Sequence, residues 1–207
     1  MYLWLVSNTH TPTPQQSPDD MPKITAGVLI GGASRRMGTP KHLIQHEGRT
    51  WLEWVVDAIA PHTQDIVLLG QGDLPTPLNN LEHLLDPPQV RGPCAGLLAA
   101  MQRHPSKAIL LVACDTPDIN THHLLTLLQA RAPDIQALAH RFGSDIQPIP
   151  ALFEPTALPT LISRIQRKQF SLKGLLDQLH THLLDHPGRI PTGLRGYNRP
   201  QDIKERT

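Results

Sequence analysis

The chain has 207 residues, 39% of them hydrophobic, which is enough for one domain with a continuous core. Its 19 Lys and Arg residues nearly balance its 18 Asp and Glu residues, so no basic stripe favours a nucleic-acid polymer as a partner. No apolar run approaches the roughly 18 residues that a membrane span requires, and because 2 cysteines cannot form a disulfide framework, we expect a reducing, cytoplasmic compartment.

The N-terminal stretch differs in composition from the rest of the chain. Met1–Val6 is apolar, but it lacks the basic flank and the length of a secretory signal. The segment TPTPQQSPDD, at residues 11–20, is polar and rich in proline, which is typical of a flexible chain. We therefore expect a disordered extension over residues 1–20 and one folded domain over residues 21–207.

An apolar strand then runs into a loop rich in glycine and basic residues. Val28–Ile30 stops abruptly at Gly31 and Gly32, and the loop continues as ASRRMGTPK to Lys41. Glycines let the backbone approach an anion and offer N–H groups to it, while Arg36 and Lys41 add positive charge. At the carboxyl edge of an α/β sheet, such a loop predicts a site for a phosphorylated ligand. The alternative is a glycine-rich turn with solvated arginines.

Two common phosphate-binding loops do not fit this stretch. A Walker A loop requires Gly-Lys-Ser/Thr in succession, whereas Gly38 and Lys41 are separated by Thr39 and Pro40. A dinucleotide fingerprint requires Gly-x-Gly-x-x-Gly, which the residues after Ile30 do not supply.

A helix and a second strand follow the loop. Thr50 is placed to cap the helix, and Glu53 completes a capping box. The apolar residues of the helix fall on one face: Trp51, Leu52, Val55, Val56 and Ile59. Ile66–Leu69 then forms a buried strand that ends at Gly70. Strand, helix and strand together predict a βαβ unit with parallel pairing.

The central part of the chain places a carboxylate after its clearest strand. Leu84–Leu85 predicts a short strand that ends at Asp86, and Gly92–Leu97 a turn that enters a helix. Ile109–Ala113 is an apolar strand that runs directly into CDTP, so Asp115 would face the ligand crevice, where Asp suits Mg²⁺. The alternative is that Asp115 or Thr116 caps the next helix.

The C-terminal half continues the alternation of helices and strands. The predicted elements are a helix over 121–130, strands over 135–139 and 149–153 joined by a turn at 142–145, and helices over 156–166 and 171–179. Together they predict an α/β fold, a Rossmann-like three-layer sandwich with a mostly parallel central sheet. The histidine-rich segment His180–His186 does not complete a zinc spacing, and we interpret its histidines as solvated.

The first loop, read as Gly-Gly-x-Ser-x-Arg-Met-Gly-x-x-Lys, resembles the signature of nucleotidyltransferases, most closely the molybdenum cofactor guanylyltransferase family. Gly92–Leu97 and Cys114–Pro117 match two further family motifs. The closing motif, Asn-x-Asn-Thr-Pro-x-Asp-Leu, is matched at Asn198, Pro200 and Asp202, but Gly196 and Arg199 depart from it.

The resemblance implies an Mg²⁺-dependent nucleotidyltransferase domain that moves GMP from GTP onto molybdopterin. It implies catalytic roles for Arg36, Lys41 and Asp115, metal binding by Asp115, and acceptor binding by Asn198. The implied nucleotide-binding residues are Ile30, Gly31, Gly32, Ser34, Lys41, Gly70, Asp86, Gly92 and Asp115. Partners would be GTP, molybdopterin and, transiently, molybdoenzymes or cofactor-insertion proteins. The rivals are a cytidylyl- or sugar-nucleotide transferase of the same fold and a non-catalytic, nucleotide-binding cofactor carrier.

Overall fold

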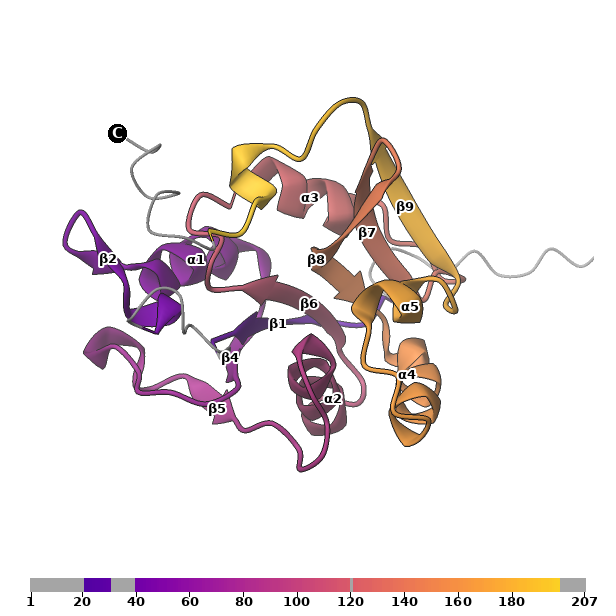
Figure 1. The fold of residues 1–207 in the computed structure, drawn as a ribbon, viewed down its shortest axis with the longest axis horizontal. Coiled ribbons are helices and arrows are strands. Elements are labelled where there is room, and N and C mark those ends of the chain that lie inside the picture. Colours follow the sequence, from indigo (N-terminus) through magenta and orange to yellow (C-terminus); the bar gives the residue numbers. More distant parts are fainter. Residues whose placement is uncertain (1–20, 31–39, 120, 198–207) are drawn as a thin grey trace, which may run out of the picture.

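A mixed sheet organises the computed structural model, which describes residues 21–30, 40–119 and 121–197 (Figure 1). The described residues form a 7-stranded sheet in the order β5-β4-β1-β6-β8-β7-β9. Its strands are β1 (Ile24–Leu29), β4 (Asp65–Leu69), β5 (Glu82–Leu84), β6 (Ala108–Ala113), β7 (Ala137–Phe142), β8 (Asp145–Phe153) and β9 (Thr181–His186). Only β8 runs antiparallel to its neighbours in this sheet, so the predicted, mostly parallel α/β class is confirmed.

Helices cover both faces of the sheet and complete the predicted three layers (Figure 1). On one face lie α1 (Trp51–Ile59) and α3 (Thr121–Gln129); on the other lie α2 (Pro93–Arg103), α4 (Leu158–Gln166) and α5 (Leu172–Leu176). The sheet has a hydrophobic core on each face, and alternate residues of one strand pack into the two cores because side chains on a strand point to opposite faces. In β6, for example, Leu110 packs toward α1 and α3, whereas Leu111 packs toward α2 and α4.

The predicted βαβ unit at the start of the domain is confirmed. The Thr50 hydroxyl accepts a hydrogen bond from the Glu53 N–H at 3.2 Å, and the Glu53 carboxylate accepts one from the Thr50 N–H at 2.7 Å. This capping box satisfies N–H groups that the first helical turn leaves without a partner, and the bond from the Thr50 N–H lowers the pKa of Glu53. A small hairpin of β2 (Gln45–His46) and β3 (Arg49–Thr50), which the sequence did not predict, leads into α1.

The sequence also did not predict β9, whose residues were interpreted as a solvated, histidine-rich segment. In the structure β9 pairs in parallel with β7, with Leu183 beside Ala139 and Leu184 beside His140. His182 is exposed, as expected, but His186 is half-buried, so the interpretation was wrong for His186. The pairing of β9 with β7 partly buries this segment, and nothing in its short, polar sequence indicates that burial.

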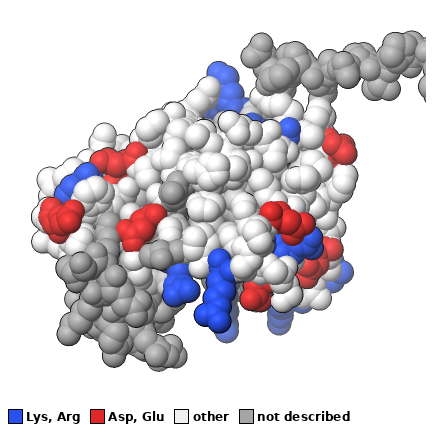
Figure 2. Space-filling view, turned by 90° about the horizontal axis from the view of Figure 1, so that it is seen from above, with Lys and Arg blue, Asp and Glu red and all other residues white. Residues whose placement is uncertain are grey.

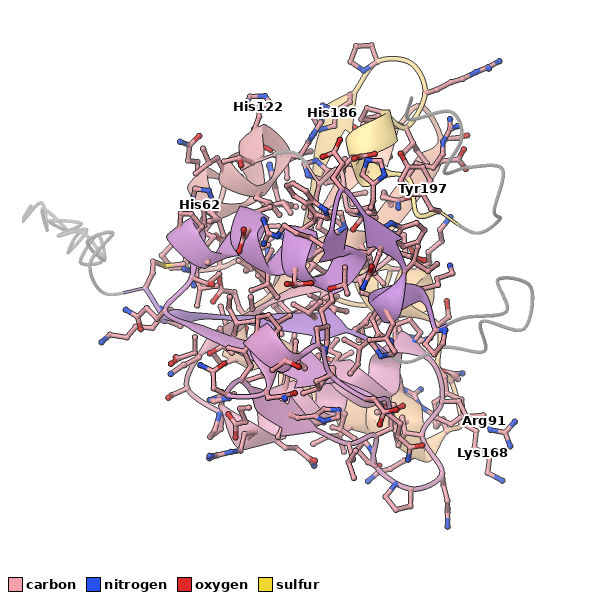
Figure 3. All side chains as sticks on the ribbon, turned by 90° about the vertical axis from the view of Figure 1, so that its left-hand side faces the viewer. His62, Arg91, His122, Lys168, His186 and Tyr197 are labelled. Carbon is pink, nitrogen blue, oxygen red and sulfur yellow. The ribbon has the colours of Figure 1, made fainter. Side chains whose placement is uncertain are left out.

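A histidine cluster lies where α3, β7 and β9 meet, and Figure 3 shows His122 and His186 at this end of the molecule. His140 is 0% exposed; its Nδ1 lies 2.9 Å from Nε2 of His186, and its Nε2 lies 3.1 Å from the carbonyl oxygen of His123. The His186 ring stacks on the Phe142 ring, with ring centroids 4.8 Å apart. Among the described residues, no group of three or more His, Cys, Asp or Glu is placed to hold a metal ion. The contacts of His140 and His186 in this cluster join β7 to β9 and to α3.

Acidification is expected to destabilise the domain through His140. Burial lowers its pKa from 6.5 to about 4; the charges of His186, His123 and His122 act in the same direction, and the hydrogen bond to the His123 carbonyl oxygen opposes them. Between these values the unfolded chain binds more protons than the folded one, so stability falls as the pH drops from about 6.5 toward 4. At pH 4.5 the free energy of unfolding should be about 2 kcal/mol lower than at pH 6.5. Urea unfolding at these two pH values measures the difference, and His140→Gln, whose side chain cannot titrate, is the comparison. An equal pH dependence in that variant would contradict this assignment.

On the face shown in Figure 2, acidic and basic side chains are scattered among other residues and form no broad patch of one sign. Within the described part of the chain, no helix is long and apolar enough to cross a membrane.

Candidate active site

The carboxyl ends of β1, β4 and β6 meet at the middle of the sheet. The Ile30 N–H donates to the Leu69 carbonyl oxygen at 2.9 Å, and the Cys114 N–H donates to that of Leu29 at 3.0 Å. The chain therefore leaves β1 between two parallel neighbours, which is where α/β sheets bind ligands. The loop residues Gly31, Gly32, Ser34 and Arg36, like residues 1–20 and Asn198, lie outside the described residues.

The structure brings Lys41 and Asp115 together at this edge. The Lys41 Nζ lies 2.7 Å from Oδ2 of Asp115, although 74 positions separate the two residues in sequence. Their side chains are 19% and 23% exposed, so the pair is sheltered but open to a ligand. The Thr116 hydroxyl donates to the Ala113 carbonyl oxygen at 2.8 Å. The Asp115 carboxylate is thus hydrogen-bonded to Lys41, and the Thr116 hydroxyl to the backbone of Ala113.

A buried histidine holds the turn that carries Lys41. This turn is a short 3₁₀ helix, Lys41–Leu43, and its His42 side chain is buried, with Nε2 lying 2.9 Å from the Asp73 carbonyl oxygen. The ring packs on Gly72, where a Cβ would lie 2.6 Å from the ring, so only glycine allows this approach. The residues around His42 give no sign of this role in the sequence. The one available signal was the glycine at position 72, after β4.

The other described candidates lie at the neighbouring strand and helix ends. Gly70 follows β4, and its N–H donates to the Leu84 carbonyl oxygen at 3.0 Å. Gly92, with a φ of 65°, precedes the first turn of α2. Asp86 lies two residues after β5; it is largely exposed, and partial desolvation raises the pKa of its carboxyl.

Comparisons with known proteins agree with this geometry. Residues 26–183 match the family model described as the MobA-like NTP transferase domain. A molybdenum cofactor guanylyltransferase from Vibrio cholerae is 28% identical over 196 residues, covering 93% of this chain and 96% of the relative. A probable molybdenum cofactor guanylyltransferase from Bacillus licheniformis is 24% identical over 185 residues, covering 86% and 93%.

Solved structures share the fold. The molybdopterin-guanine dinucleotide biosynthesis protein A from Archaeoglobus fulgidus has a TM-score of 0.71 at 21% identity, covering 87% of this chain and 95% of that one. The Rv0371c protein of Mycobacterium tuberculosis, in complex with manganese, has a TM-score of 0.62 at 17% identity, covering 88% and 97%.

Proposed function

The chain belongs to the MobA-like NTP transferase family, and from this premise we propose that it transfers GMP from GTP to molybdopterin. The products would be molybdopterin guanine dinucleotide and pyrophosphate. The relatives that match nearly the whole chain are named for this activity. The observation that carries the proposal is the Lys41–Asp115 pair, at 2.7 Å, at the carboxyl edge of β6. A carrier without catalysis would not require a cation and a carboxylate paired at this edge of the sheet.

The reaction would depend on positioning and charge. The terminal phosphate of molybdopterin is already an anion near neutral pH, so its attack on the α-phosphate of GTP requires no strong general base. Lys41 would offset the negative charge that builds on the α-phosphate and on the departing pyrophosphate. Arg36 and the backbone N–H groups of Gly31–Ser34 would bind the donor phosphates, a role that rests on the sequence resemblance.

The residues present fit a divalent cation, for which we propose Mg²⁺. Asp115 offers a partly exposed carboxylate, and Mg²⁺ in phosphate-transfer sites is commonly held by one or two carboxylates together with substrate phosphates. When bound, the metal would supply positive charge that offsets the negative charge of the donor phosphates. Lys41 balances the charge of Asp115 through the hydrogen bond from its Nζ to Oδ2. The manganese complex of the Mycobacterium tuberculosis neighbour supports a divalent ion.

Nucleotide choice would depend on groups around this pair. We assign Asp86 to the guanine base, because a carboxylate can accept hydrogen bonds from N1–H and N2–H₂ of guanine, which adenine lacks. Asn198 would bind the acceptor. The remaining nucleotide contacts would come from the backbone at Ile30, Gly70 and Gly92. We also propose a cytoplasmic location and transient contact with the molybdoenzymes or insertion proteins that receive the product.

A side-by-side turnover assay tests the nucleotide. Pyrophosphate release would be measured with molybdopterin and either GTP, CTP or ATP, each with Mg²⁺. The proposal expects release with GTP to exceed release with the other two. Preference for CTP would identify a cytidylyltransferase instead, and binding of GTP without release from any nucleotide would indicate a carrier.

A further inference from the structure

The last described residues of the chain, Gly196 and Tyr197, lie against Asp115. The Tyr197 N–H donates to the Asp115 carbonyl oxygen at 2.8 Å. At Gly196, a Cβ would lie 3.1 Å from Oδ1 and 3.2 Å from Oδ2 of Asp115. The backbone of this segment therefore touches the carboxylate that Lys41 also contacts. A side chain at position 196 would therefore require the carboxylate or the segment to shift by a few tenths of an ångström.

Tyr197 is anchored to two other parts of the fold. Its side chain is buried, and its hydroxyl donates a hydrogen bond to Oδ2 of Asp118, in the loop after β6. Its ring packs on Trp51, the first residue of α1, with ring centroids 5.6 Å apart and planes at 45°. A buried tyrosine whose hydroxyl is hydrogen-bonded and whose ring is packed is held in one orientation. Figure 3 shows Tyr197 within the body of the molecule.

We propose that Tyr197 is a positioning residue for Asp115, acting through Gly196 and through its own backbone. The Tyr197–Asp118 hydrogen bond and the Trp51 contact fix the segment, and the segment limits the orientations open to the Asp115 carboxylate. Because displacement of a reacting group by about 1 Å lowers rates by about 10²-fold, such a support has a measurable effect. This inference rests on the proposed function, in which Asp115 holds the metal.

The test removes the anchor and leaves the packing intact. Tyr197→Phe keeps the ring on Trp51 but removes the hydroxyl, and it should lower kcat by about 10-fold and weaken binding of GTP with Mn²⁺. Asp118→Ala should lower kcat by as much, whereas Asp118→Asn, which keeps an acceptor oxygen, should lower it much less. The double variant Tyr197→Phe/Asp118→Ala should have a kcat no lower than that of either single variant. Gly196→Ala should have the larger effect, because its Cβ meets the carboxylate directly.

Thr181→Val is the matched control. Its hydroxyl donates to the Leu176 carbonyl oxygen at 2.7 Å, in β9 and away from the candidate site, so this variant loses a hydrogen bond without touching Asp115. It should lower the melting temperature as Tyr197→Phe does, but leave kcat unchanged. An equal loss of kcat in Thr181→Val, or wild-type kcat and Mn²⁺ affinity in Tyr197→Phe, would overturn the inference.

The two proposals fail in different ways. If the wild-type protein made no dinucleotide from GTP and molybdopterin, the proposed function would fail. Calorimetric titration of Mn²⁺ into each variant with GTP would still test the positioning role, because metal affinity does not depend on turnover. Weaker Mn²⁺ binding in Tyr197→Phe and Gly196→Ala, but not in Thr181→Val, would support that role; equal binding in all of them would refute it.

Discussion

Asp115→Asn is expected to reduce turnover by at least about 10²-fold while the protein still unfolds cooperatively. Asn keeps the shape of the side chain and one oxygen, but it removes the negative charge that balances Lys41 and that would bind Mg²⁺. The loss should therefore be selective: the Mg²⁺ concentration needed for half-maximal turnover rises, and stability changes little. Turnover measured against Mg²⁺ concentration for both proteins checks this.

The control for Asp115→Asn is the same substitution in a surface ion pair. Asp65 pairs with Lys107 at the amino end of the sheet, and its side chain is half exposed, so Asp65→Asn should leave turnover unchanged. If Asp115 only capped a helix, Asn would replace it almost silently, because Asn and Asp cap helices about equally well. An unchanged Mg²⁺ dependence in Asp115→Asn would thus count against the metal role.

Lys41→Ala should lower turnover by about 10²-fold, the loss typical of one preorganised charge contact in a transition state. Lys41 lies 2.7 Å from Asp115 and directly follows the glycine-rich loop, so it is placed to meet the phosphates of a nucleotide. The variant should also bind GTP more weakly, which calorimetry measures independently of turnover. Lys107→Ala, which removes a lysine from a comparable ion pair elsewhere, is the matched control. Turnover within about threefold of the wild type would make Lys41 a structural residue.

Local pattern was sufficient for the elements that carry their own signals. The apolar run of β6 and the Thr50–Glu53 capping box before α1 are both visible in the sequence, and both are present in the structure. In β9, by contrast, only Leu183 and Leu184 are apolar, between polar residues that also suit a loop. Its strand conformation depends on pairing with β7, a tertiary contact that no short window of sequence contains.

In the candidate site too, some features could be predicted from the sequence and others could not. Parallel strands bring their carboxyl ends to one edge, so the place of Asp115 after β6 could be predicted from topology, whereas its direct contact with Lys41, in a turn well beyond the end of β1, could not. The contacts of His42 with Gly72 and of Tyr197 with Asp118 could not, because each joins parts of the chain whose local sequences give no sign of a partner. These supporting contacts emerge only from the packed fold.

The central claim, transfer of GMP to molybdopterin, is tested most directly by the mass of the product. The wild-type protein would be incubated with GTP, Mg²⁺ and molybdopterin, and the mixture analysed by mass spectrometry beside a reaction with Asp115→Asn. We expect molybdopterin guanine dinucleotide and an equal amount of pyrophosphate from the wild type, and nearly none from the variant. Unmodified molybdopterin with intact GTP, or the same product yield from both proteins, would contradict it.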